Sequence, residues 1–455
     1  MMAAAAESER VGERLRLHVP APVVQIAATL EDAGHETWCV GGAVRDALLG
    51  IPHLDWDLAT AAPPPQVRRL FRRTVPKGIE FGTVSVFDDA GVEHEVTTFR
   101  RDVRTDGRHA VVEFGASLDE DLARRDLTIN AVAYHPLRET LHDPFGGRDD
   151  LARRVVRAVG EPEARMREDR LRALRAIRFA ARFDFEIEPR TWDAIRGSAP
   201  YLGRLSAERV KQELDKTMAQ VRRAGGALAR WRSAGALAAL VPTLADVADE
   251  TLGALDLLPP AVGRRAAERR VVRYATLFAD VPAAALPPVL KALKFSNAES
   301  NAVQRVVRGW QALGPGMEAA LASGVPPAGA TVRRWVSQAG RTDVGAVLRV
   351  AAARWAARRG ASVPAPEPAA ARALHRRLLR AGYREPVALS DLAVGGDELR
   401  AAGVAPGPAM ARLLHRLLDA VLDDPTLNSV DSLLALVRRW TADGPDAGAE
   451  GRPAR

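Results

Sequence analysis

The sequence predicts an α+β protein, in which a mixed sheet with helices is followed by a remainder that is helical throughout. Two observations carry this prediction. Between residues 35 and 100 the segments HETWCV, FGTVSVFD and VEHEVTTFR are short and rich in β-branched and aromatic residues, as strands are. From about Leu151 onward the apolar residues recur with helical spacing, as in REDRLRALRAIRFAARF and ARLLHRLLDAVLDD.

The elements of the first part follow in a clear order. A helical pattern, PVVQIAATLEDAG, ends at Gly34 and precedes the first strand segment. A glycine pair, Gly41 and Gly42, then separates that strand from a charged helix. Turn residues at 88, 89 and 91 separate the last two strand segments, which predicts a hairpin.

Proline and glycine clusters mark candidate boundaries in the helical remainder. They lie near residues 257–263, 314–328 and 361–369. At 455 residues the chain is long enough for roughly two to four domains. We predict five parts: a lead-in over 1–20, a head over 21–150, a neck over 151–220, a body over 221–330 and a tail over 331–455.

Composition excludes several classes of protein. A hydrophobic content of 47% with 27% charged residues is ordinary for a globular protein, and no run approaches the roughly 20 apolar residues of a membrane-spanning helix. The first 19 residues contain acidic residues and no apolar core of the kind a signal peptide has. The single cysteine, Cys39, excludes intramolecular disulfides and a cysteine zinc cluster. We therefore expect a cytoplasmic protein with no membrane association.

The charge suggests a polyanionic partner without proving one. The formal net charge is +8, and only five of the 65 basic residues are lysine. Arginine guanidinium groups match the geometry of phosphate, so the balance suits nucleic acid. Codon bias produces the same arginine-rich composition, so charge alone does not decide.

Two aspartates follow the glycine pair, in the stretch VGGAVRDALLGIPHLDWDLAT. Because side chains alternate along a strand, Asp55 and Asp57 share one face while Trp56 and Leu58 face the core. Two carboxylates on one face repel each other unless a cation lies between them. The alternative is a solvated edge strand whose charges have no function.

A third acidic residue is expected from a neighbouring strand, and VEHEVTTFR offers Glu93 and Glu95. A glycine pair, then Asp-x-Asp, then an acid on a later strand resembles the DNA polymerase β nucleotidyltransferase superfamily. GGAVRD with DWD resembles, more narrowly, the class II tRNA nucleotidyltransferases and bacterial poly(A) polymerases. The resemblance implies a polymerase-β-like head, two Mg²⁺ ions held with the help of Asp55 and Asp57, and Glu95 rather than Glu93 as the third catalytic acid.

Two further motifs extend the resemblance. DEDLARRDLTINA, residues 119–131, resembles the family's ribose-recognition motif, which implies that Arg125 and Asp126 hold the incoming nucleotide. The alternative is a charged helix with internal ion pairs. REDRLRALRAIRFAARFDF, residues 167–185, resembles the base-recognition motif. Its candidate residues recur every three positions and so form a slowly drifting stripe along one side of a helix. The alternative is an ordinary solvated face. The residues are Asp169, Arg172, Arg175 and Arg178.

The resemblance spans residues 38 to about 216 and implies an enzyme. In the family the aspartate and first arginine of the base motif bind the Watson–Crick edges of ATP and CTP. We therefore expect addition of CCA to the tRNA 3′ end without a nucleic-acid template, with Gly42 and Arg45 contacting the triphosphate and no obligate protein partner. Alternatives are poly(A) polymerase, a partial CC- or A-adding enzyme, and an RNA-binding protein with an inactive head. The loop RRDVRTDGRHAVV lacks the Tyr and Pro common in the family, which bears on nucleotide choice.

Overall fold

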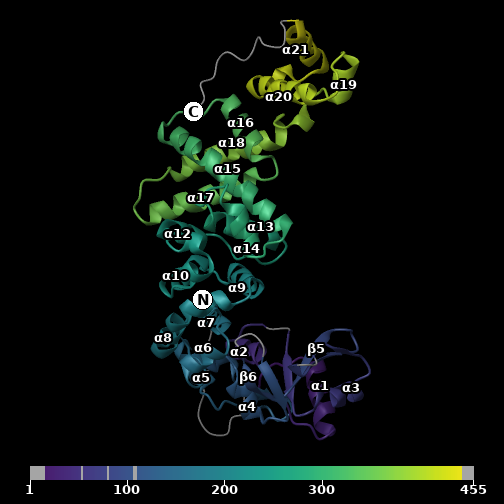
Figure 1. The fold of residues 1–455 in the computed structure, drawn as a ribbon, viewed down its shortest axis with the longest axis vertical. Helices are drawn as coiled ribbons and strands as arrows, with labels where there is room; N and C mark the ends of the chain where they lie inside the picture. The colour runs from purple at the N-terminus through teal and green to yellow at the C-terminus, as the bar shows by residue number, and fades with distance from the viewer. Residues whose placement is uncertain (1–15, 53–54, 79–80, 106–109, 443–455) are drawn as a thin grey trace. The chain divides into compact units, whose positions relative to one another are not determined.

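The computed structural model describes residues 16–52, 55–78, 81–105 and 110–442. The chain forms two compact units, one of Met1–Thr217 with Arg230–Ala245 and the other of Met218–Ala229 with Asp246–Arg455 (Figure 1). The finer division into five parts stays a prediction. No helix in the described ranges is long and apolar enough to cross a membrane.

A seven-stranded mixed sheet forms the centre of the first unit, as predicted. Its strand order is β3-β4-β5-β2-β1-β8-β9. Only the β2–β5 pair is parallel, and β4 and β5 form the predicted hairpin. The strands are β1 (Thr37–Val40), β2 (Asp57–Thr60), β3 (Thr74–Pro76), β4 (Thr83–Phe87), β5 (Glu93–Thr98), β8 (Ala133–His135) and β9 (Thr140–His142).

Two small sheets were not expected. The segment taken as a loop contributes to an antiparallel pair, β6 (Arg100–Thr105) with β7 (Ala110–Phe114). The turn of that segment, residues 106–109, lies outside the described residues. The helical part also contains a short parallel pair, β10 (Val155–Val156) with β11 (Glu186–Ile187), whose strands are too short to produce a sequence pattern.

Helices surround the sheet and continue the first unit. The glycine-pair helix is α2, and the base-motif helix is α7, which follows α6 after a two-residue break. The helices are α1 (Ala21–Asp32), α2 (Gly42–Leu48), α3 (Pro64–Leu70), α4 (Leu118–Ala123), η2 (Thr128–Asn130), α5 (Gly147–Arg153), α6 (Pro162–Glu168), α7 (Leu171–Phe183), α8 (Pro189–Ser198), η3 (Ala199–Arg204), α9 (Ala207–Gln220), α10 (Ala224–Ser233), α11 (Ala236–Leu240) and η4 (Pro242–Leu244). The end of α9 and the first part of α10 belong to the second unit, which contains Met218–Ala229.

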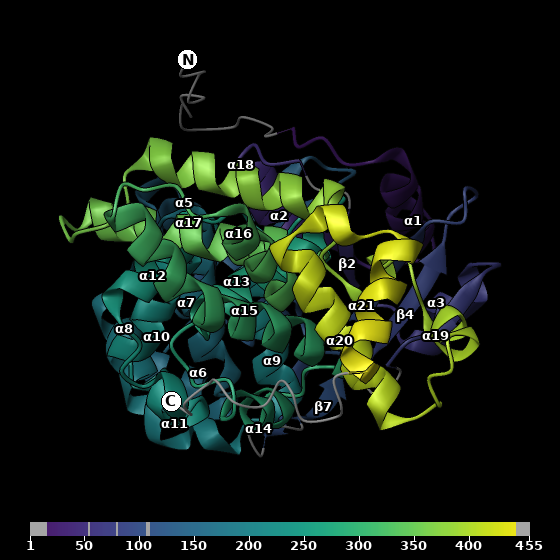
Figure 2. The ribbon, with the colours of Figure 1, turned by 90° about the horizontal axis from the view of Figure 1, so that it is seen from above.

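The second unit is helical throughout its described part, as predicted. The proline cluster near 314–328 begins inside a helix, because Pro315 lies within α15. Helices α20 and α21 lie side by side over a shared apolar cluster (Figure 2). The elements are α12 (Asp249–Asp256), α13 (Ala266–Leu277), α14 (Leu286–Ala292), α15 (Asn297–Ala322), α16 (Gly329–Ala339), α17 (Val344–Gly360), α18 (Pro368–Arg384), η5 (Leu389–Asp391), α19 (Gly396–Ala401), α20 (Pro408–Asp423), η6 (Pro425–Leu427) and α21 (Val430–Ala442).

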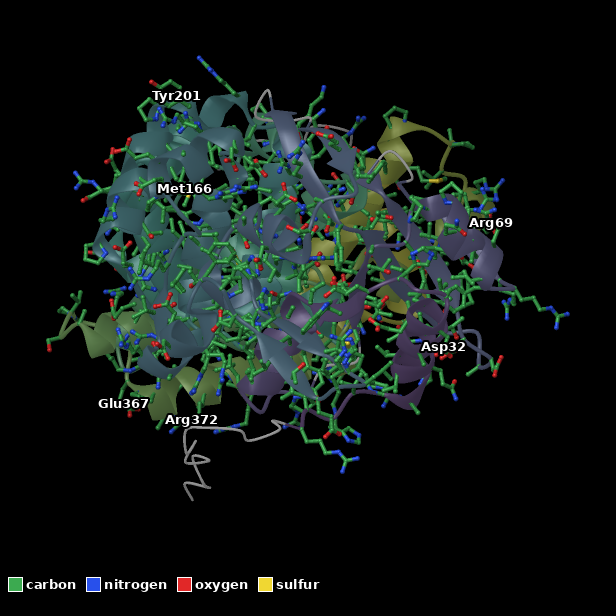
Figure 3. All side chains as sticks on the ribbon, turned by 90° about the horizontal axis from the view of Figure 1, so that it is seen from below. Asp32, Arg69, Met166, Tyr201, Glu367 and Arg372 are labelled. Atoms are coloured by element: carbon green, nitrogen blue, oxygen red, sulfur yellow. The ribbon has the colours of Figure 1, made fainter. Side chains whose placement is uncertain are left out.

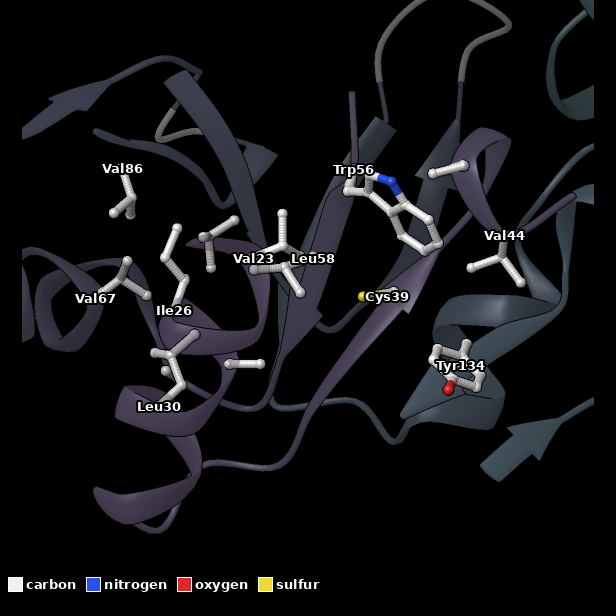
Figure 4. Close-up of a cluster of buried hydrophobic side chains, with 14 of the residues drawn as sticks. Val23, Ile26, Leu30, Cys39, Val44, Trp56, Leu58, Val67, Val86 and Tyr134 are labelled. Atoms are coloured by element: carbon white, nitrogen blue, oxygen red, sulfur yellow. The ribbon is translucent and has the colours of Figure 1, made fainter. Parts of the chain in front are cut away.

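Apolar clusters cover both faces of the sheet. One contains Trp56 and Leu58 of the β2 region together with α1 residues such as Leu30 (Figure 4). Cys39 belongs to the same cluster and is fully buried, and burial raises the pKa of its thiol well above the usual range. The other cluster contains Ala59 of β2. The sequence prediction that Trp56 and Leu58 face the core is therefore confirmed.

Candidate active site

The two aspartates of DWD lie at the start of a central strand. Asp55 is exposed, Asp57 begins β2 and is half-buried, and Trp56 between them is only 2% exposed. Because β2 lies between β5 and β1, it is not an edge strand. The alternative of a solvated edge strand is therefore excluded, and a pair of carboxylates stands where a central strand emerges from the core.

The parallel pairing of β2 with β5 brings a third carboxylate beside this pair. Leu58 is paired with Val96, so the residues that precede them, Asp57 and Glu95, lie level on adjacent strands. Both side chains leave the face opposite to the buried Leu58 and Val96. The sheet therefore places Glu95 next to Asp57.

Strand alternation does not distinguish Glu95 from Glu93. Both side chains are on the same face of β5, since His94 and Val96 are buried while Glu93 and Glu95 are at least partly exposed. The two glutamates are two residues apart, and only Glu95 is level with Asp57. Register, rather than face, is the structural argument for Glu95.

A lysine joins the two glutamates of β5. The Lys77 ammonium lies 3.0 Å from Glu93 Oε1 and 2.9 Å from Glu95 Oε1. Its hydrogen bonds, first to Glu95 and then to Glu93, raise the pKa of Lys77. The Ser85 hydroxyl donates to Glu93 at 2.6 Å, and this bond is the main cause of the lowered pKa of Glu93. In this conformation the Lys77 ammonium lies beside Glu95, the expected third acid.

The carboxylates are the right kind of ligand for a hard divalent cation, but the three of them are not arranged around one site. Carboxylate oxygens are the preferred protein ligands of such ions, and Asp55 and Asp57 offer two of them. Within the described residues, no group of three or more His, Cys, Asp and Glu side chains is arranged to hold a metal. The third carboxylate, Glu95, is instead directed to Lys77. The aspartate pair is therefore the part of the site that fits a metal.

The glycine turn between β1 and α2 lies against the ribose motif. Gly41 has φ 75° and ψ −131°, a conformation that favours glycine. A Cβ atom at this position would stand 3.0 Å from Arg125 Nη1. Arg125 is held by Asp121, whose carboxylate accepts from Nη2 at 3.1 Å. Absence of a side chain at Gly41 thus lets Arg125 lie next to the turn that begins α2 at Gly42.

The Arg45 side chain is buried and bonded within the protein. Its side chain is only 3% exposed, and its guanidinium bonds Asp46 through Nε at 2.8 Å and Asn130 through Nη1 at 2.5 Å. The guanidinium carbon also lies 4.8 Å from the ring centroid of Phe179 and 4.9 Å from that of Phe183. Burial lowers the pKa of Arg45, although Asp46 opposes the shift. In this geometry the Arg45 guanidinium is directed into the protein, and its contact with a triphosphate stays a prediction.

Asp126 is buried and ionised. One carboxylate oxygen accepts from Asn130 Nδ2 at 2.9 Å and from the Leu127 amide at 3.0 Å, and the other accepts from Arg175 Nε at 2.7 Å. Burial by itself raises the pKa of Asp126, but the charge of Arg175 and the Asn130 hydrogen bond outweigh it and hold that pKa well below its usual range. A fixed carboxylate therefore lies one residue from Arg125.

The four candidates of the base motif are brought to one region but have different partners. Asp169 lies between α6 and α7, where it accepts from the Leu171 amide at 3.0 Å and from Arg209 at 2.6 Å. Arg172 bonds Glu168 at 2.6 Å and the Arg124 carbonyl at 3.0 Å.

The two later arginines of α7 reach two further elements. Arg175 bonds Asp126, and Arg178 bonds Glu213 of α9 at 2.7 Å. Burial lowers the pKa of Arg178 although Glu213 opposes it, while Asp126 raises the pKa of Arg175. The side chains of Arg172, Arg175 and Arg178 are 12%, 31% and 4% exposed, so the alternative of a solvated face is excluded.

Several residues at this site were missed from the sequence. They are Asn130, Phe179, Phe183 and Arg182. Asn130 and the two rings contact Arg45 directly, and Arg182 reaches it through Asp46. Asn130 belongs to the quoted motif RRDLTINA, and that membership is the signal that was available.

Comparison with known proteins agrees with these motifs. Residues 37–157 match the family described as the poly A polymerase head domain, and residues 184–247 match the probable RNA and SrmB-binding site of polymerase A. A CCA-adding enzyme of Streptococcus pyogenes is 46% identical over 195 residues, which is 42% of this chain and 48% of that protein. A CCA-adding enzyme of Pediococcus pentosaceus is 47% identical over 194 residues, with the same shares. These matches span about half the length of the curated relatives.

A solved structure extends the similarity along the chain. The crystal structure of the Bacillus stearothermophilus CCA-adding enzyme in complex with CTP is 31% identical and has a TM-score of 0.72. The similarity covers 93% of this chain and 98% of that one. Relatives of this kind are nucleotidyltransferases, for which use of a divalent metal is expected. On the strength of this near-complete match and of the shared head domain, the chain belongs to the CCA-adding enzyme family of nucleotidyltransferases.

Proposed function

We propose that this protein adds C, C and A in turn to the 3′ end of tRNA, using CTP and ATP and no nucleic-acid template. The observation that carries the proposal is the position of Asp57 and Glu95 on neighbouring strands, with the glycine turn, Arg125, Asp126 and the base-motif helix in the same unit. The similarity to a relative solved with CTP supports it. A protein that handles tRNA in this way would work in the cytoplasm.

The carboxylates serve the chemistry of nucleotidyl transfer. Asp55 and Asp57 would hold Mg²⁺, which when bound would lower the pKa of the primer 3′-hydroxyl and steady the departing pyrophosphate. The β2–β5 pairing keeps Asp57 beside Glu95. For Glu95 to act as the third acid, its carboxylate has to leave Lys77, which the exposed position of both side chains permits. No covalent intermediate is required.

The ribose and triphosphate are assigned to the turn and to the RRD motif. The backbone at Gly42 begins α2, where free amide groups suit phosphate. Arg125 lies against the neighbouring Gly41 and supplies a cation. Asp126 remains ionised, so its carboxylate can accept a hydrogen bond from a ribose hydroxyl. Arg45 would stabilise this region through its buried bonds to Asp46 and Asn130.

Base selection is assigned to Asp169 and Arg172. A carboxylate accepts from the exocyclic amine of cytosine or adenine, and a guanidinium donates to their ring acceptors, whereas uracil and guanine present the opposite pattern. Both residues have protein partners here, Arg209 for Asp169 and Glu168 for Arg172, which a bound base would replace. Arg175 and Arg178 hold α7 in place through their bonds to Asp126 and Glu213.

Helix α18 of the second unit offers a surface for RNA. Its exposed arginines are spaced by four residues and so share one face of the helix. They are Arg372, Arg376, Arg380 and Arg384. Arg372, labelled in Figure 3, lies near the N-terminal end of this helix. A row of cations along one helix suits the phosphates of a polynucleotide, and its contribution should weaken as salt rises.

One assay tests the proposal against its alternatives. The protein is incubated with tRNA that lacks its terminal CCA, with each nucleoside triphosphate alone and with all four, and the products are sequenced. We expect CCA and then termination. A long run of A would identify a poly(A) polymerase, addition of CC alone or A alone a partial enzyme, and no addition with retained RNA binding an inactive head.

A further inference from the structure

Six side chains of the first unit form a ring in which five links are hydrogen bonds and the sixth is helix α7 itself. The ring runs from α2 to Asn130 of η2, and from there to Asp126 of the RRD motif. It continues along α7 and returns to α2. In that order its members are Asp46, Arg45, Asn130, Asp126, Arg175 and Arg182. Every hydrogen bond between charged members joins an arginine to an aspartate, and Asn130 is the neutral member.

The ring closes because two of its members share one helix. Arg175 and Arg182 are seven residues apart on α7, which is about two turns, so they lie on the same side of it. Arg175 Nε bonds Asp126 at 2.7 Å, and Arg182 Nη2 bonds Asp46 Oδ2 at 3.0 Å. The base-motif helix is thus held at two points, one by the ribose motif and one by the helix that follows the glycine turn.

Asn130 is the neutral link of this ring. Its Oδ1 accepts from Arg45 Nη1 at 2.5 Å, and its Nδ2 donates to Asp126 Oδ1 at 2.9 Å. The residue is 6% exposed. An amide is the group that can satisfy a cation on one side and a carboxylate on the other without adding charge. Alanine would leave both neighbours short of a partner, and aspartate would place a second carboxylate beside Asp126.

We propose that Asn130 is a positioning residue that ties the glycine-turn helix to the base-motif helix and thereby sets how strictly the base is chosen. The proposal rests on the proposed function, because it takes Arg172 as a base reader. Arg172 lies one turn before Arg175 on α7. A loosened Arg175 would let Arg172 move, and discrimination by a polar site depends on fixed donors and acceptors.

The aromatic pair beside the ring supports this role. Phe179 and Phe183 are stacked at 6.1 Å with an interplanar angle of 5°, and the Arg45 guanidinium lies within 5 Å of both centroids. Asn130 and Asp46 fix the orientation of that guanidinium. Loss of Asn130 would therefore release Arg45 from η2 and weaken its hold on α7.

A purely structural role makes a different prediction. If the ring only stabilised the fold, Asn130→Ala would lower the melting temperature, but the folded variant would choose nucleotides as the wild type does. A positioning role requires a change in the preference for CTP over UTP among molecules that are folded. Melting curves and nucleotide binding therefore have to be measured together.

The test measures binding of CTP and UTP, each from its effect on the melting temperature, and needs no tRNA. We expect Asn130→Ala to reduce the ratio of CTP to UTP affinity about tenfold, as loss of a partner in a buried polar network does. The matched control is Asn301→Ala, at an exposed position of α15, with wild-type affinities. An unchanged ratio of CTP to UTP affinity in folded Asn130→Ala, whether or not both affinities fall, would overturn the proposal.

A second measurement tests the polarity of the link. Asn130→Asp should be more damaging than Asn130→Ala, and adding Asp126→Asn should restore part of the CTP preference by removing the pair of carboxylates. The cycle of single and double variants isolates the coupling between the two positions. Effects that simply multiply would show that the two residues act independently, contrary to the proposal.

Misfolding of the Asn130 variants and failure of the proposed function are each recognised by a separate measurement. If Asn130 variants do not fold, Arg182→Gln opens the ring at a side chain that is 24% exposed, and we expect a smaller loss of CTP preference; an unchanged preference overturns the inference. Failure of the proposed function is recognised separately, because the wild type would then bind nucleotides without extending tRNA.

Discussion

Asp126 and Arg175 form an ion pair of 2.7 Å between the ribose motif and the base-motif helix, across 49 residues of sequence. The Asp126 side chain is 8% exposed and the Arg175 side chain 31%. This contact joins two motifs that the sequence shows only as separate stretches. It also makes the site sensitive to acid.

Stability of the first unit should fall in acid through Asp126. Its pKa is lowered in the folded protein, so its contribution is present above the ordinary aspartate pKa of about 3.9 and is lost as pH falls toward the folded value. We expect Arg175→Met to reduce the free energy of unfolding by about 2 kcal/mol at pH 7 and by less below pH ~3. Urea unfolding at both pH values measures this; a constant difference would contradict it.

Asp55→Ala or Asp57→Ala should abolish nucleotide incorporation while tRNA binding remains. Loss of metal ligands removes several kcal/mol of transition-state stabilisation, which is about a thousandfold in rate or more. Primer extension and a filter-binding assay give the two quantities. Asp89→Ala, at an exposed turn, is the control. Near-normal turnover in either active-site variant would show that the site is misassigned.

Glu95→Ala should reduce turnover severely and Glu93→Ala should not. Both glutamates contact Lys77 and share a face, but only Glu95 is level with Asp57. Steady-state rates of CTP addition compare the two variants directly. If Glu93→Ala were the inactive one, the assignment by register would be wrong.

Replacing Asp169 and Arg172 together with alanine should let UTP and GTP compete with CTP and ATP, even if rates fall. A site that hydrogen-bonds its substrate discriminates strongly because a wrong partner leaves polar groups unpaired. If the residues only formed surface ion pairs, their loss would cost about 0–1 kcal/mol and leave base choice unchanged. Competition among all four nucleotides decides, with Arg153→Ala at an exposed position as control.

Arg273→Met should destabilise the second unit by about 3 kcal/mol or more. The Arg273 side chain is fully buried, and burial lowers its pKa to about 10. Its guanidinium donates to four backbone carbonyls, those of Met218, Val221, Arg222 and Leu258. Arg273→Lys should rescue little, because one ammonium cannot reproduce the planar fork. Thermal unfolding of both variants checks this, and a wild-type melting temperature would contradict it.

The sequence by itself determined what depends on local periodicity. Alternation placed Trp56 and Leu58 in the core and Asp55 and Asp57 on the opposite face, because neighbouring side chains of a strand point to opposite sides. Helical spacing identified the helices after residue 151. The roles of the candidate site residues stay predictions, although the motifs that contain them come together in one unit.

Tertiary structure decided which partner each charged side chain has. The stripe of Arg172, Arg175 and Arg178 looked uniform in sequence, but a drift of 60° per three residues directs each arginine to a different element. Arg45 is buried because α7 brings Phe179 and Phe183 over it. Such contacts join segments far apart in the chain, so no local pattern contains them.

Register was the other property that only the folded chain could settle. Alternation left Glu93 and Glu95 equivalent, and the parallel pairing of β2 with β5 distinguished them. The role of Asn130 likewise depends on Arg45 and Asp126 approaching it from two sides. Periodicity determines the face of an element on which a residue lies, whereas register and packing determine what that residue meets there.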